Sequence, residues 1–136
     1  MSAAAADSYS FTVTPSTTTY AASGGYVTVT VNLSYARSIA ALDLSIATPP
    51  GWKYVAATGP NVPQTPPEAG DLGQRGLAFV YTAMPGSPAS FSVTISYPPG
   101  LSGPQSLSLI AANFTDEATS RITPVNQADI VLTPHR

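Results

Sequence analysis

Hydrophobic and polar residues alternate most regularly over residues 26–33. The apolar positions are Val27, Val29, Val31 and Leu33, and Thr28, Thr30 and Asn32 lie between them. A period of two predicts a half-buried strand of an antiparallel sheet. Residues 39–47 repeat the pattern through Leu42, Leu44 and Ile46. We expect these two strands to pool their apolar sides against a second sheet.

Six further segments carry strand patterns, and turns rich in proline and glycine separate several of them. They are residues 10–14, 52–57, 77–81, 91–97, 105–114 and 129–133, and residues 115–126 are expected to form a loop. Many short strands with turns between them are typical of an all-β protein. The pattern predicts an antiparallel two-sheet β-sandwich of the jelly-roll kind, with eight or nine strands.

The length of the chain is that of one domain. We expect a flexible N-terminal segment over residues 1–8 and a single β-sandwich domain over residues 9–134. Residues 58–76 contain four prolines and four glycines and form the longest irregular segment. A loop of this length is either a recognition element or a rigid cover over an end of the sandwich, and we favour the cover.

Charged residues make up only 9% of the chain, and serine, threonine and alanine take many of the positions that charged residues usually occupy. With a net charge of −2 and a single lysine, Lys53, the chain lacks the basic patch that nucleic acid requires. No stretch approaches the length of a membrane helix, so we expect no direct membrane insertion. The absence of cysteine excludes disulfides and thiolate chemistry. This composition is typical of an exported module, secreted or at a bacterial cell surface.

Four segments resemble the cohesin family, the jelly-roll sandwiches of bacterial extracellular assemblies, and more loosely the related carbohydrate-binding sandwiches. They are residues 26–33, 39–46, 52–57 and the Phe-Thr-Asp sequence at 114–116. The resemblance implies a non-catalytic module that binds a dockerin-like protein or neighbouring domains of a larger protein. In the family, outward residues of the third strand contact dockerin through an asparagine and, two positions on, an aspartate.

By this resemblance the partner-binding residues are Ala41, Asp43 and Ser45. Asp43 stands at the aspartate position, and Ala41 stands where the asparagine would be. The simpler alternative is that Asp43 is a solvent-facing residue of an amphipathic strand.

Catalytic residues are not indicated by any motif. The only histidine, His135, is the penultimate residue, and no pair of carboxylates is marked by a motif, so we expect no enzyme. Asn113, Asp116 and Glu117 carry oxygens of the kind that Ca²⁺ prefers, but they lack EF-hand spacing. We therefore expect no cofactor and no metal.

A carbohydrate-binding module is the alternative function, with polysaccharide as the partner. It would stack sugars on exposed flat rings, and Trp52 and Tyr54 are the candidates. A single tryptophan in a sandwich more often anchors the core, however. If both rings point inward, Lys53 between them faces water.

Overall fold

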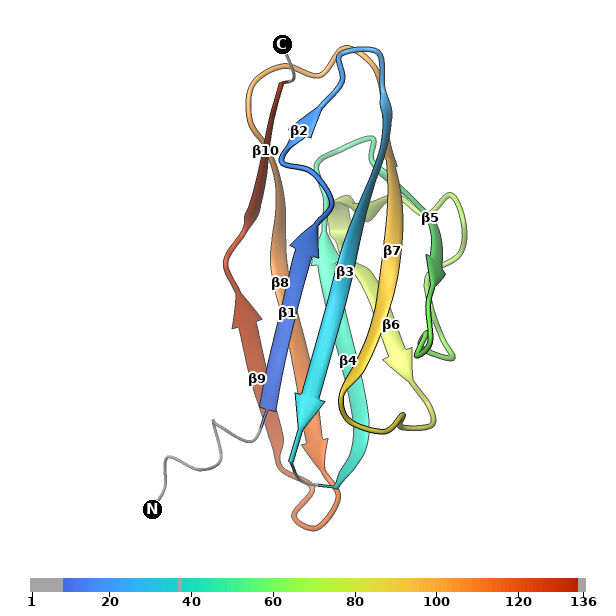
Figure 1. Cartoon of the computed structure of the whole chain (residues 1–136), viewed down its shortest axis with the longest axis vertical. Helices are drawn as coiled ribbons and strands as arrows, with labels where there is room; N and C mark the ends of the chain where they lie inside the picture. Colours follow the sequence, from blue (N-terminus) through green and yellow to red (C-terminus); the bar gives the residue numbers. More distant parts are fainter. Residues whose placement is uncertain (1–8, 37, 135–136) are drawn as a thin grey trace.

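The computed structural model describes residues 9–36 and 38–134. The expected flexible segment over residues 1–8 lies outside this range, as does His135. The strands of the described part are β1 (Tyr9–Pro15), β2 (Thr19–Tyr20), β3 (Gly25–Tyr35), β4 (Ile39–Ala47), β5 (Lys53–Thr58), β6 (Leu77–Tyr81), β7 (Ala89–Tyr97), β8 (Gln105–Asp116), β9 (Ile122–Gln127) and β10 (Ile130–Pro134) (Figure 1). A short 3-10 turn, η1 (Gly73–Arg75), precedes β6. No helix in the described residues is long and apolar enough to cross a membrane.

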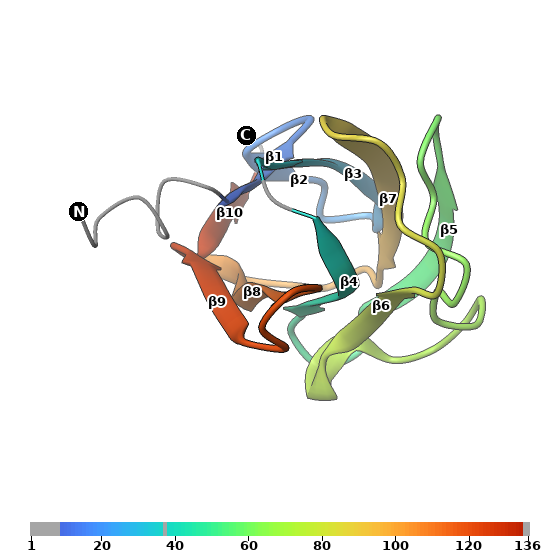
Figure 2. The same cartoon turned by 90° about the horizontal axis from the view of Figure 1, so that it is seen from below.

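Two sheets face each other and enclose the core (Figure 2). One sheet has the order β1-β3-β7-β5, and the other has the order β2-β10-β8-β4-β6, with β9 also paired to β8. The predicted all-β, two-sheet sandwich is confirmed. The strands β3 and β4, however, lie in opposite sheets and do not share one, because β3 pairs with β1 and β7 whereas β4 pairs with β6 and β8.

The apolar residues that alternate with polar ones along β3 and β4 are the residues that the structure buries. Val27, Val29, Val31 and Leu33 of β3 are at most 1% exposed, and Leu42, Leu44 and Ile46 of β4 meet them from the other layer. Aromatic rings fill the centre: the Phe79 ring lies 5.7 Å from that of Phe91 and 5.8 Å from that of Tyr54, measured between centroids. Each such side chain stabilises the fold by about 1.5–3 kcal/mol through burial.

The strand count differs from the expected eight or nine, because β2 and β9 were not predicted. The sequence pattern indicated a loop over residues 115–126, yet β9 begins at Ile122 and pairs along β8. No residue of β9 is fully buried, and the sequence of β9 therefore shows no apolar side. Proline lacks the amide that a central strand needs, and Pro124 is tolerated because β9 forms its ladder with β8 through one edge. The two-residue β2 pairs with β10 in parallel, which departs from a wholly antiparallel sandwich.

The irregular segment 58–76 covers strand edges and not an end of the sandwich. Thr65 exchanges two backbone hydrogen bonds with Val80 on β6, and Tyr54 on β5 receives a bond from the Gly70 amide and donates one to the Asp71 carbonyl. On the other side, the side-chain amide of Gln127 bonds both the amide and the carbonyl of Val13 on β1. Covered edges of this kind do not offer a template for another strand.

Candidate functional site

The three residues predicted to bind a partner project from β4 on the side away from the core. Ala41 and Asp43 are exposed and Ser45 is half-buried. Because β4 lies between β6 and β8, its outward residues stand in the middle of a continuous surface, which we call the β4 face. It consists of Ala41, Asp43 and Ser45 on β4, Ala78 and Val80 on β6, Ala111, Asn113 and Thr115 on β8, and Ile122, Pro124 and Asn126 on β9.

A polar pair occupies the centre of the β4 face. Asp43 and Asn113 are cross-strand partners, and the Asn113 Nδ2 donates a hydrogen bond of 2.9 Å to Asp43 Oδ1. Asp43 is the only ionisable residue of the face. Val80 lies beside Asp43 on β6, and Pro124 lies beside Asn113 on β9. The carboxylate keeps unused acceptor positions that point to solvent, because an ionised carboxylate can accept about four hydrogen bonds.

Sequence reasoning missed the role of Asn113. The resemblance placed the asparagine at position 41 of the same strand, where this chain has alanine, whereas the fold supplies an asparagine from β8. The available signal was its outward position between buried Ala112 and Phe114. That signal gives the side of the strand but does not identify Asp43 as the neighbour.

Leu109 and Ile122 are the most exposed large apolar side chains in the described strands of the same sheet. Ile122 of the β4 face is 61% exposed, and Leu109 of β8 is 75% exposed. Leu109 has a φ of 51°, in the left-handed region, where the β8 register to β4 shifts between Ser45 and Ala47. This conformation costs a non-glycine residue about 1–2 kcal/mol, and such strain concentrates at functional positions. Leu109 borders a hollow of about 510 Å³ that also contains Ser45, Asn126 and Asp129.

The aromatic pair proposed for carbohydrate lies inside the protein. Trp52 is 0% exposed and Tyr54 is 4% exposed, so neither ring offers a surface for sugar stacking. The reason is the pleat of the chain: both residues alternate with Lys53, which is exposed as expected. Tyr26 is 69% exposed, but the described residues show no strip of exposed aromatic rings around it.

The carboxylate of Asp116 is used within the fold. It is buried, and its Oδ1 accepts hydrogen bonds from the amides of Ala118 (2.8 Å) and Thr119 (3.1 Å), which hold the turn between β8 and β9. The adjacent Glu117 is exposed. Among the described residues, no three Asp, Glu or His side chains are grouped as they would be around a metal ion.

Shifted pKa values occur at buried tyrosines. Burial raises the pKa of Tyr35, Tyr54 and Tyr81 above the ordinary value, and the Tyr81 hydroxyl donates to the Asn61 carbonyl at 2.6 Å. A raised pKa keeps these phenols neutral, and they lie away from the β4 face. Their role is in packing.

No protein-family model matches the sequence, and no curated protein matches it significantly. Among solved structures, a type II cohesin domain from the cellulosome of Acetivibrio cellulolyticus is similar, with a TM-score of 0.60 at 13% identity over 92% of this chain and 95% of that chain. AggA, the major subunit of aggregative adherence fimbriae type I from Escherichia coli, gives a TM-score of 0.47 at 11% identity over 93% and 95%. The chain therefore has a cohesin-like β-sandwich fold, as the sequence resemblance implied.

Proposed function

We propose that this cohesin-like domain is a non-catalytic protein-binding or structural module of a larger secreted or cell-surface bacterial protein. Residues 9–134 act as one domain in this proposal. A dockerin-like module is the partner that we favour, and a neighbouring domain of the parent protein is the alternative. The β4 face is the surface that binds it.

The observation that carries the proposal is the composition of the β4 face. Its middle has one hydrogen-bonded polar pair, Asp43 and Asn113, among small and apolar side chains. Protein interfaces have few charges in their centre, and a small number of residues there supply most of the binding energy. The apolar and small side chains can be desolvated at low cost, while the Asp43 carboxylate requires hydrogen-bond donors from the partner and so provides direction.

Leu109 and Ile122 supply apolar contacts at the two ends of this surface. Both are large, and more than half of each side chain is exposed. Full burial of a leucine or isoleucine side chain contributes about 1.5–3 kcal/mol. A partner element that lies along β8 would cover both and would offer hydroxyl or amide donors to the Asp43 carboxylate between them.

A matched pair of variants tests the location. Ser45→Arg places a long cation in the middle of the β4 face, and Ser92→Arg makes the same change on β7, on the outer side of the opposite sheet. Both serines are half-buried and lie on central strands, so their effects on stability should be similar. Binding to a panel of purified dockerin modules is measured by biolayer interferometry.

We expect at least one dockerin to bind. Ser45→Arg should weaken binding by about tenfold or more, because the long side chain obstructs the β4 face and can pair with the Asp43 carboxylate two residues away, which withdraws that carboxylate from the partner. Ser92→Arg should bind as the unchanged protein does. Equal loss in both variants would place the interface elsewhere. Failure of every dockerin to bind would contradict a dockerin-type partner.

A further inference from the structure

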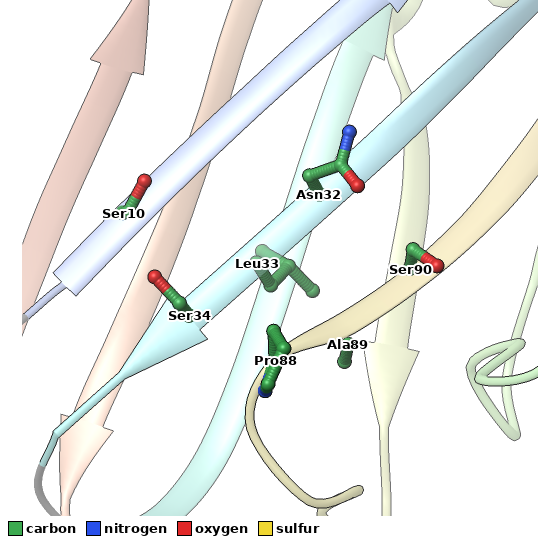
Figure 3. Close-up of a pocket in the computed structure, with 7 residues that line it drawn as sticks. All are labelled: Ser10, Asn32, Leu33, Ser34, Pro88, Ala89 and Ser90. Atoms are coloured by element: carbon green, nitrogen blue, oxygen red, sulfur yellow. The ribbon is translucent and has the colours of Figure 1, made fainter.

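A second surface feature lies on the opposite sheet, far from the β4 face. It is a shallow hollow of about 290 Å³ over β1, β3 and the start of β7 (Figure 3). We call it the Asn32 hollow. The polar side chains that line it are Ser10, Asn32, Ser34 and Ser90, with Pro88 beside them and the buried residues Leu33 and Ala89 beneath.

Pairing of the strands brings these polar groups together. Ser10 is the cross-strand partner of Ser34, and Asn32 is the partner of Ser90. Asn32 and Ser34 stand on the same side of β3, two residues and therefore about 6.6 Å apart. Residues from three strands thus contribute to one small area.

The hydrogen-bonding groups of the hollow have no side-chain partner among the described residues. The Asn32 amide and the hydroxyls of Ser10, Ser34 and Ser90 make no side-chain hydrogen bond there, in contrast to Asn113, which bonds Asp43. An asparagine amide provides two donors and one acceptor, and each hydroxyl both donates and accepts. These groups are therefore available to a ligand.

Among the residues that the structure describes, no Asp, Glu, Lys or Arg lines the hollow. An ionised ligand would lose hydration there without gaining an opposite charge. The fitting ligand is neutral and carries many groups that both donate and accept hydrogen bonds. Sugar hydroxyls have this chemistry, and the exposed Pro88 ring offers an apolar surface to the C–H groups of a sugar.

We infer that the Asn32 hollow binds a neutral oligosaccharide through hydrogen bonds to Asn32 and the three serines. This differs from stacking on Trp52 and Tyr54, which are buried. The hollow and the β4 face lie on the outer sides of different sheets, so the inference does not depend on the proposed protein partner.

The test is a titration of the ¹⁵N-labelled protein, followed by amide chemical shifts. The probes are cellohexaose, xylohexaose and mannohexaose, with hexagalacturonate as the anionic counterpart. We expect at least one neutral hexasaccharide to shift the amides of Ser10, Asn32, Ser34 and Ser90, and hexagalacturonate to shift none of them.

Two variants at side-chain amides complete the experiment. Asn32→Ala should weaken the binding of that hexasaccharide by about tenfold, the effect of one or two lost hydrogen bonds. Gln74→Ala, at an exposed side-chain amide of η1 that belongs to neither proposed surface, should bind normally. Both variants should keep the thermal midpoint, because they change exposed side chains.

Three results would overturn the inference. The first is the absence of shifts with all three neutral sugars at millimolar concentration. The second is a set of shifts that lies on the β4 face or that appears equally with hexagalacturonate. The third is unchanged affinity of Asn32→Ala.

Discussion

Gly73 is the position where the segment 58–76 is fastened to the sandwich. Its amide donates to the Trp52 carbonyl at 3.0 Å, and its carbonyl accepts from the Thr48 amide at 2.8 Å. It therefore connects the end of β4 to the start of β5. A Cβ at this position would overlap Thr48 Oγ1 and would lie 2.8 Å from Thr48 Cγ2 and 3.1 Å from Thr48 Cβ.

Gly73→Ala should therefore destabilise the protein. Thr48 is only 5% exposed and β-branched, so its side chain has little freedom to turn away. Overpacking of this kind costs about 1–3 kcal/mol. If the segment lifts instead, the two backbone hydrogen bonds that join Gly73 to Thr48 and Trp52 are lost at about 1 kcal/mol each, which is a similar total.

Gly73→Ala should no longer lower the free energy of unfolding when Thr48 is replaced by alanine. Thr48→Ala removes the two closest atoms and by itself costs about 1 kcal/mol for the buried methyl group. In that background Gly73→Ala should be neutral or should stabilise by up to about 1 kcal/mol, because alanine restricts the unfolded chain. The two changes are therefore expected to couple by about 1–3 kcal/mol.

Urea unfolding of the wild type, both single variants and the double variant measures this coupling. The midpoint should fall for Gly73→Ala and should return to the Thr48→Ala value in the double variant, with similar slopes throughout. A Gly73→Ala variant as stable as the wild type would show that no overlap exists at this site. Additive losses in the double variant would show that Thr48 is not the group in contact.

Two further predictions concern an edge and a buried phenol. Gln127→Ala should lower the free energy of unfolding by about 1–2 kcal/mol and speed hydrogen exchange at the Val13 amide, because both side-chain bonds to β1 are lost. The control Asn126→Ala, at an exposed side chain, should change stability by less than about 0.5 kcal/mol. Unchanged exchange at Val13 would refute the prediction. Burial raises the pKa of Tyr81 above its ordinary value of 10.0, so the folded state binds the phenolic proton more tightly than the unfolded state. The stabilisation that the raised pKa of Tyr81 provides is fully present below pH 10 and is lost as the pH rises above 10. Tyr81→Phe should be less stable than the wild type at neutral pH by about 1 kcal/mol, because the bond to Asn61 is lost. This difference in the free energy of unfolding should narrow above pH 10 in urea titrations. A difference that stays constant with pH would contradict a raised pKa at Tyr81.

The residues of the proposed sites were predictable to different degrees. The alternation around Asp43 was enough to place it on the outer side of β4, because the side of a strand depends only on local spacing. The same rule places Lys53 on the side opposite to Trp52 and Tyr54, but only the structure shows that the two rings are the buried side, which removes the stacking pair. The Asn32 hollow was not predictable, since its groups come from three strands whose order the sequence does not state.

The sequence by itself determined eight of the ten strand segments and which of their sides is apolar, since each of these segments repeats its pattern within a few residues, whereas β2 and β9 carry no such pattern. Tertiary structure decided the rest. The opposite placement of β3 and β4, the pairing of Asp43 with Asn113 seventy residues away, and the left-handed Leu109 at the register shift depend on which strands meet. Such contacts are chosen by the packing of the whole core and by the closure of its edges, and no local window of residues carries that information.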